Sequence, residues 1–278
     1  MNEAKADMTH IYNDEAPTDY FRELYKLDYA IPGHAKPVFD SLIDSLIAER
    51  GSPLHILDVG CSYGVNSALL KYDLEMRDLY RYRFSEAGMA ASPEEDKTRF
   101  EDCGTREDLE IVGLDPATRA LEYAERAGLL DDAIAADLES GQLSPEAERT
   151  LAPIDLMIST GCVGYIGERS FEKLMPALVS GDRPAWIANF VIRMFPFDQI
   201  ADTLSRWNYA TEKLDGRYFP QRRFSDPEEK ANILSCLEDA GLDTSKLESD
   251  GRIYAEFFLA RPAEEAKRKP IDELLVAA

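Results

Sequence analysis

The sequence predicts an α/β fold in which helices cover both faces of a mostly parallel sheet. Short apolar segments typical of buried strands alternate along the chain with segments that have helical periodicity. No internal repeat of the kind found in solenoids or propellers is visible. The chain has 278 residues, which is enough for one large domain with insertions.

The first 50 residues are predicted to form an N-terminal arm and lid. A polar arm is followed by an aromatic-rich stretch at 20–29 that includes Tyr29, and Pro32-Gly33 then breaks the chain. A helix is expected over 37–49, because its apolar residues recur on one face. We expect these tyrosines to fold over a binding pocket as a lid.

A central domain is predicted over 51–262. Its expected strands lie at 54–59, 110–114, near Ile134, 154–159, 185–192 and 253–260. Its expected helices lie at 65–72, 116–128, 168–178 and 227–240. Segments 73–109 and 196–225 interrupt the alternation and are treated as insertions. The Asp250-Gly251 pair predicts a hairpin before the last strand. The charged tail, 263–278, is either a loose arm or a docking helix.

Composition narrows the classes of partner. There are 31 basic and 53 acidic residues, so a net charge of −22 disfavours binding to a phosphate backbone. No apolar run has the length of a membrane span, and the N-terminus does not resemble a secretion signal. Four scattered cysteines indicate neither a disulfide framework nor a zinc site. We therefore expect a cytoplasmic protein without a metal, nucleic-acid or membrane partner.

The clearest motif is Asp58-Val-Gly60-Cys-Ser62-Tyr-Gly64, at the junction of a predicted strand and helix. Gly60 permits the unusual dihedral angles of a sharp turn, and the two glycines leave room for a ligand against the backbone. The helix that follows presents unpaired N–H groups to an anionic group, and Asp58 can accept from an ammonium. An ordinary strand-to-helix turn is the alternative interpretation.

Two further acids follow predicted strands. Asp115 ends the second strand, where a carboxylate can accept from two ribose hydroxyls, although it also suits the N-cap of the next helix. Asp137 follows the third strand and can accept from an adenine amino group, although a plain surface acid is equally consistent with its position.

Taken in this order, the motifs resemble those of the class I S-adenosylmethionine-dependent methyltransferases, over about Leu54 to Arg261. The resemblance implies a Rossmann-like seven-stranded sheet with an antiparallel last strand, and S-adenosylmethionine (SAM) as cofactor. It implies these cofactor-binding residues: Asp58, Gly60, Ser62, Gly64, Asp115, Asp137 and Ser159. Ser62 replaces the family's central glycine. The ribose acid lies unusually far from the glycine loop, and the insertion at 73–109 accounts for the gap.

The acceptor is expected beside the later strands, because open α/β sheets bind ligands at the carboxyl ends of their strands. Candidates for acceptor binding are Tyr29, Thr160, Asn189, Arg193, Phe195 and Arg222. Arg222 and Arg223 are either a carboxylate clamp or solvated charges. Tyr165 and His34 are the catalytic candidates, against the alternatives of a packing aromatic and a surface histidine.

The predicted function is methyl transfer to a small, partly apolar acceptor. Three alternatives stay open: a SAM-dependent intramolecular cyclase, an NAD-dependent dehydrogenase and a non-catalytic binding protein. The G-x-G-x-x-G spacing of dehydrogenases is absent. The sequence determines neither the acceptor atom nor the oligomeric state, and a homodimer is one of the open alternatives.

Overall fold

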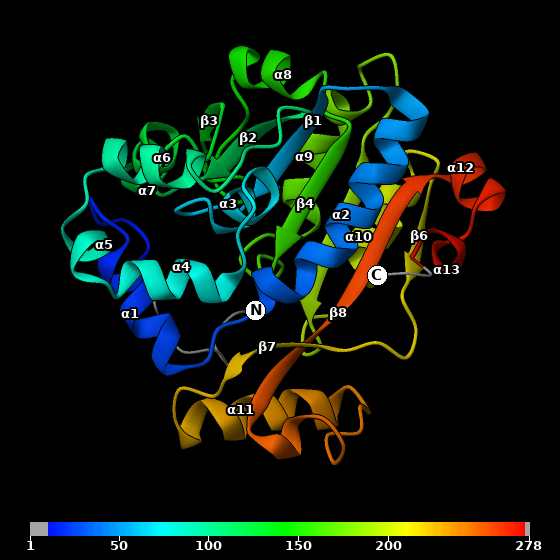
Figure 1. Cartoon of the computed structure of the whole chain (residues 1–278). Coiled ribbons are helices and arrows are strands. Elements are labelled where there is room, and N and C mark those ends of the chain that lie inside the picture. The colour runs from blue at the N-terminus through cyan, green and yellow to red at the C-terminus, as the bar shows by residue number, and fades with distance from the viewer. Residues whose placement is uncertain (1–10, 276–278) are drawn as a thin grey trace.

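The computed structural model describes residues 11–275, and these contain one eight-stranded sheet with the order β3-β2-β1-β4-β5-β8-β6 (Figure 1). The eighth strand, β7, pairs with the free half of β8. The strands are β1 Leu54–Val59, β2 Leu109–Asp115, β3 Asp132–Ala135, β4 Leu156–Thr160, β5 Trp186–Ile192, β6 Tyr209–Lys213, β7 Phe219–Arg223 and β8 Arg252–Pro262. Neighbours from β3 to β5 pair in parallel, and β8 is antiparallel to β5, β6 and β7.

This sheet confirms the predicted fold class, a mostly parallel Rossmann-like sheet whose last strand is antiparallel. β7 is one strand more than the seven expected. β8 has 11 residues, long enough for β6 to pair with its C-terminal half and β7 with its N-terminal half. The predicted bounds of 54–59 match β1, and those of 168–178 match α9.

Helices cover both faces of the sheet. The helices are α1 Thr18–Lys26, α2 Ile31–Arg50, α3 Val65–Lys71, α4 Met76–Arg83, α5 Glu86–Ala90, α6 Pro93–Glu101, α7 Thr118–Arg126, α8 Pro145–Leu151, α9 Glu168–Leu178, α10 Asp198–Ser205, α11 Pro227–Asp239, α12 Ala263–Arg268 and α13 Ile271–Leu274, with a 3₁₀ turn, η2, at Glu248–Asp250. One apolar cluster joins the sheet to α2, α3 and α7, and another joins it to α8, α9 and α10. None of the helices within 11–275 is long and apolar enough to cross a membrane.

Helix α2 begins at Ile31, earlier than the predicted start at Pro37. Pro32 lies in the first helical turn, where the missing N–H leaves no hydrogen bond unmade, so it starts this helix and does not break the chain before it. Ile31, Ala35 and Val38 are fully buried, and this burial extends the apolar face toward the N-terminus.

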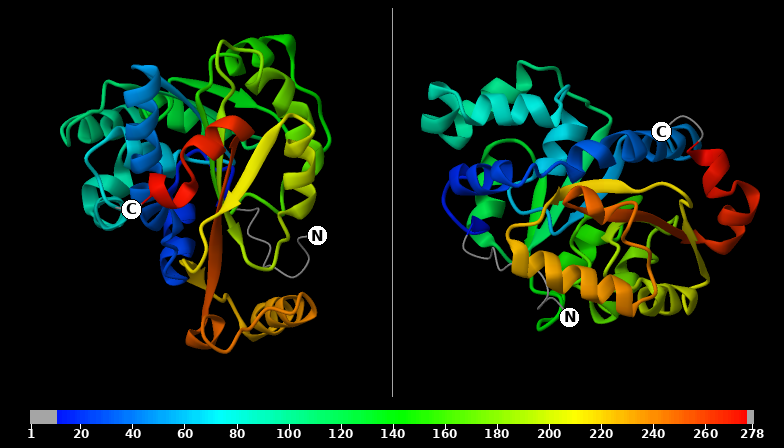
Figure 2. Two further views of the ribbon diagram at one scale, coloured as in Figure 1. Left: turned by 90° about the vertical axis from the view of Figure 1, so that its right-hand side faces the viewer. Right: turned by 90° about the horizontal axis from the view of Figure 1, so that it is seen from below.

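The segment 73–109 folds mainly as α4, α5 and α6 without disturbing the sheet. An antiparallel bridge between Tyr72 and Thr105 brings the ends of the segment together. β1 and β2 therefore pair along their length, from Leu54 with Leu109 onward. Figure 1 shows α4 beside α1, and Figure 2 shows the same helices from two other directions.

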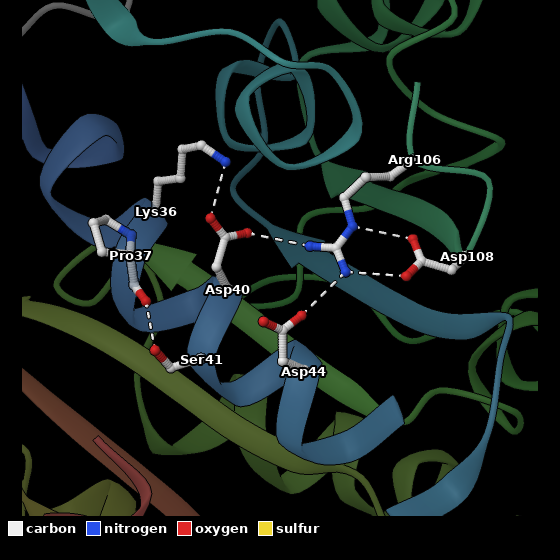
Figure 3. Close-up of polar contacts among 7 residues, drawn as sticks. All are labelled: Lys36, Pro37, Asp40, Ser41, Asp44, Arg106 and Asp108. Carbon is white, nitrogen blue, oxygen red and sulfur yellow. Dashed lines mark hydrogen bonds and ion pairs between the residues drawn. The ribbon is translucent and has the colours of Figure 1, made fainter. Parts of the chain in front are cut away.

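Charged side chains hold the end of this segment, just before β2, against α2 (Figure 3). The Arg106 guanidinium donates to Asp108 at 3.0 and 3.1 Å and reaches Asp40 and Asp44 of α2 at 3.4 Å. Lys36 donates to the other oxygen of Asp40 at 2.9 Å. These groups are partly exposed, so the network contributes modestly to stability.

Two expectations for the C-terminal part are settled by the fold. Asp250-Gly251 does not form a hairpin, because Glu248–Asp250 form the 3₁₀ turn η2 and Gly251 ends this turn with φ 86°. Of the two readings of the tail, the docking helix is the one observed: Ile271 and Leu274 of α13 are buried in the cluster that contains α2. The tail residues 276–278 and the arm residues 1–10 lie outside the described part.

Candidate functional site

A cavity of about 390 Å³ opens at the carboxyl ends of β1, β2 and β4, within the size range of small-ligand pockets. Residues from the turn after β1 and the ends of β2 and β3 line one part of it. The rest is lined by residues after β4, by the N-terminal aromatic residues and by β7. Of the predicted site residues, the following line it: Tyr29, Gly60, Ser62, Asp115, Asp137, Thr160, Tyr165 and Arg222.

The turn after β1 has the backbone geometry that its glycines predict. Gly60 and Gly64 have φ of 71° and 72°, and Ser62 shares this left-handed region with φ 47°. A Cβ on Gly60 would lie 2.5 Å from Cys162 Sγ, so no side chain fits there. The Gly60, Ser62 and Gly64 amides donate within the protein, whereas the amides in the first turn of α3 have no partner within the helix.

Asp115 holds this turn from the end of β2. Its Oδ2 accepts from the Ser62 amide at 2.9 Å, and its Oδ1 accepts from the Ala117 amide at 2.8 Å. Asp115 is not the N-cap of the next helix, because α7 begins at Thr118 and its N-cap is Ala117, and Asp115 lines the cavity. Burial raises the pKa of Asp115, and the two amide donors oppose that rise.

Asp137 borders the cavity from the loop after β3, with an exposed side chain. Its oxygens accept from the Ser140 hydroxyl at 2.5 Å and from the amides of Glu139 and Ser140. The Ser140 hydroxyl is the main reason why the pKa of Asp137 is lowered. The carboxylate is thus ionised and held in a local turn at the mouth of the site.

Asp58 lies behind the cavity wall. It is fully buried, and it accepts from Asn66 Nδ2 at 3.1 Å and from the Ser67 hydroxyl at 3.2 Å. Asn66 does line the cavity, and its amide also bonds to Thr160 Oγ1 at 3.1 Å. Asp58 therefore positions Asn66 and does not border the ligand space itself. Burial is the largest influence on this carboxyl and raises its pKa to about 7.

This raised pKa predicts a pH-dependent stability. The folded state binds the Asp58 proton more tightly than the unfolded state, so the stabilising contribution is complete below about pH 4 and is lost as pH rises through about 7. We expect Asp58→Asn to remove this part of the pH dependence, which amounts to a few kcal/mol. Chemical denaturation of both proteins across this pH range measures it, and parallel curves would contradict the prediction.

Gly64, Ser159 and Asn189 do not line the cavity, because each packs inside the protein. Gly64 packs against α7 and its following turn, where a Cβ would be 3.1 Å from Leu129 Cβ. Ser159 and Asn189 are fully buried partners on neighbouring strands, and the Ser159 hydroxyl donates to Asn189 Oδ1 at 2.7 Å. The next residue after Ser159, Thr160, reaches the cavity in its place.

The two predicted arginines are paired with buried carboxylates. Arg193 lies outside the cavity lining and donates to both oxygens of Glu248 at 2.5 and 2.6 Å. Arg222 lines the cavity, yet its guanidinium donates to both oxygens of Glu229 at 2.6 and 2.8 Å. Neither guanidinium is a solvated charge, and the expected clamp for an acceptor carboxylate is already occupied by a carboxylate of the protein.

The two catalytic candidates are separated. Tyr165 borders the cavity with an exposed fraction of 47%. His34 lies in helix α2, where a surface loop was expected, and borders a different hollow with Arg217 and Tyr218. Burial is the main cause that lowers the pKa of His34. Phe195 packs over Gly164 and is also absent from the cavity lining.

Tyr20 belongs to the aromatic stretch that was predicted to cover a pocket, and it lines the cavity. Three other lining residues were not predicted. Tyr12 joins the wall with its ring centroid 5.7 Å from that of Tyr20, and Asn66 and Gln221 add amide groups. Nothing local marks Gln221, because its position depends on the pairing of β7 with β8.

No family model matches the chain. A search of curated proteins also finds no match. Among solved structures, a protein of unknown function from Deinococcus radiodurans R1 has a TM-score of 0.42 at 14% identity, covering 80% of this chain and 86% of that one. The plantazolicin methyltransferase BpumL in complex with SAH has a TM-score of 0.43 at 12% identity, covering 83% of this chain and 84% of that one. Magnesium protoporphyrin IX methyltransferase from Synechocystis PCC 6803 with bound SAM has a TM-score of 0.39 at 13% identity, covering 82% of this chain and 79% of that one. At this similarity, function must be inferred from the chain's own site.

Proposed function

We propose that this chain is a SAM-dependent methyltransferase that acts on a small-molecule acceptor. The observation that carries the proposal is one cavity, at the carboxyl ends of parallel strands, that joins the Gly60 turn, the β2 acid Asp115 and an aromatic wall. Ligands of open α/β sheets bind at this edge. In this proposal residues 51–262 bind the cofactor, and residues before 51 cover the acceptor.

The residues present fit the cofactor chemically. Gly60 lines the cavity with Cys162 packed against it, and Ser62 has a buried hydroxyl without a hydrogen-bond partner. An unpartnered buried hydroxyl is costly unless a ligand supplies the missing bond. Asp115 would accept from ribose hydroxyls, and Asp137 from the adenine amino group at the cavity mouth.

The bound cofactor would supply an activated methyl group, so the chain itself needs little acid or base chemistry. Asn66 and Thr160, held together by hydrogen bonds and anchored on Asp58, would fix the floor between cofactor and acceptor. The tyrosines of the N-terminal segment would exclude water and align the acceptor. Tyr165 would act as a base, and accept a proton, only where the acceptor must lose one.

Isothermal calorimetry with S-adenosylhomocysteine (SAH) tests the cofactor assignment first. Turnover of SAM with a panel of small acceptors then tests the reaction. Formation of SAH with a methylated product is expected. Methylthioadenosine would indicate cyclisation instead, and SAH binding without turnover of any acceptor would indicate a binding protein. Absence of SAH binding by the folded chain would reject the proposal.

The catalytic candidates give opposite expectations. Tyr165→Phe should lower kcat by about a hundredfold for an acceptor that must be deprotonated, because Tyr165 lines the cavity and the variant lacks the hydroxyl. His34→Asn should leave kcat unchanged, because His34 borders the other hollow. Steady-state kinetics measure kcat for both variants, and their SAH affinity is the control. A normal rate in Tyr165→Phe would restrict Tyr165 to packing.

A further inference from the structure

The acceptor end of the cavity is an aromatic wall built from the N-terminal segment. Tyr12, Tyr20, Leu24, Tyr29 and Pro32 all line it. The Tyr20 ring meets that of Tyr12 edge to face, with centroids 5.7 Å apart. Burial raises the pKa of Tyr12 and Tyr29, so their hydroxyls stay neutral. A flat ring would find apolar contact here and no formal charge on the wall.

Charge at this end of the cavity is neutralised within the protein. Arg222 is the single basic side chain among the described residues that line the cavity. Both of its terminal nitrogens donate to Glu229, and Nη1 also donates to the Arg223 carbonyl at 2.8 Å. The Arg222 and Glu229 side chains are 3% and 2% exposed. An anionic acceptor would therefore meet no unpaired cation, and burying it would be costly.

Gln221 supplies a polar group within this wall. It is 4% exposed and lines the cavity, and its Oε1 has no hydrogen-bond partner. A buried amide oxygen without a donor costs free energy that a ligand can recover. The Gln221 amide packs against Gly161. A Cβ at Gly161 would collide with Gln221 Nε2, so this glycine makes room for the amide.

A β-bulge turns Gln221 toward the cavity. Along β7, Pro220 pairs with Tyr254 and Arg222 pairs with Ile253, so Gln221 is an extra residue without a partner on β8. Its carbonyl instead accepts from the Ala30 amide at 2.8 Å, which ties the bulge to the start of α2. Bulges beside sites commonly redirect one side chain in this manner.

We propose that the acceptor is an uncharged aromatic compound whose hydroxyl or N–H group is bound by the Gln221 amide, with its ring against the wall of Tyr12, Tyr20 and Tyr29. This inference rests on the proposed methyltransferase function and names its substrate class. It replaces the expected carboxylate clamp at Arg222 with recognition of a neutral donor group. Gln221 is then a specificity-determining residue.

Three probes that share a 4-ethylphenyl group and differ in charge test this inference: 4-ethylphenol, 4-ethylbenzoate and 4-ethylbenzylammonium. Each is titrated into the full chain saturated with SAH, and binding is followed by ligand-observed NMR. We expect the phenol to bind at least about tenfold more tightly than either charged probe. Equal or tighter binding of a charged probe, or no binding of the phenol, would overturn the inference.

Two variants isolate the role of the amide. Gln221→Leu should weaken phenol binding by roughly tenfold, because the donor of the ligand loses its acceptor. Gln199→Leu, at an exposed position in α10, is the matched control and should not change it. SAH affinity and thermal melting report whether each variant keeps its fold and cofactor site.

The outcomes separate the two proposals. Failure of the wild-type chain to bind SAH rejects the methyltransferase function. Normal SAH binding combined with unchanged phenol affinity in Gln221→Leu rejects the acceptor inference alone.

Discussion

Gly60→Ala is expected to lower the affinity for SAH by at least about a hundredfold, on the order of 3 kcal/mol. The new Cβ would lie 2.5 Å from Cys162 Sγ and 3.1 Å from Cys162 Cβ, and φ is 71° at this position. Either the turn or Cys162 must move, and both line the cavity. Calorimetry with SAH measures the loss, and circular dichroism checks the fold.

Two further variants separate the steric effect from backbone strain. Gly251 has φ 86°, and a Cβ there would meet nothing within 4 Å, so Gly251→Ala carries the strain alone and should bind SAH normally. Adding Cys162→Ala to Gly60→Ala removes the closest contact and should restore part of the affinity. Wild-type affinity in a folded Gly60→Ala protein would refute the cofactor assignment.

The turn at Gly60 could be predicted because its signals are local. The apolar run of β1 and the glycines that follow it lie within eleven residues, and the bounds 54–59 match the strand. The 73–109 segment did not obscure this pattern. Its ends meet at Tyr72 and Thr105, so β1 and β2 pair as neighbours despite the long interval between them.

The acceptor side was less predictable because it depends on which way each side chain points. Successive residues of a strand face opposite sides, so an error of one position changes a buried residue into a lining residue. Ser159 was predicted at the cavity, yet it pairs with Asn189 inside the sheet and Thr160 takes that place. The bulge at Gln221 is likewise a property of strand pairing and not of the sequence near it.

Pairing between distant charges also escapes a single sequence. Arg193 and Glu248 are 55 residues apart, and only the approach of η2 to the end of β5 brings them together. Arg222 is seven residues from Glu229, but Arg222 lies in β7 and Glu229 in α11, so the turn between the strand and the helix sets their relative orientation. Charged side chains such as these, which have no evident partner in the sequence, are paired with each other in the folded protein.

Arg222→Leu is therefore expected to act on stability more than on acceptor affinity. The substitution leaves Glu229 buried without its partner, and removal of one member of a buried ion pair typically costs about 3–5 kcal/mol. Arg223, the next residue, is the matched control, because its side chain is 59% exposed and pairs with Asp28, which is 44% exposed. Arg223→Leu should cost less than about 1 kcal/mol.

Urea denaturation of both variants measures these free energies of unfolding. The double variant Arg222→Leu with Glu229→Leu removes both charges together, so it should recover much of the lost stability. If Arg222 were instead a clamp for an acceptor carboxylate, Arg222→Leu would unfold at nearly the wild-type urea concentration and would selectively lose affinity for 4-ethylbenzoate. The hydrogen bonds of both terminal nitrogens to Glu229 favour the structural role, because a guanidinium committed to one carboxylate has little capacity left for another.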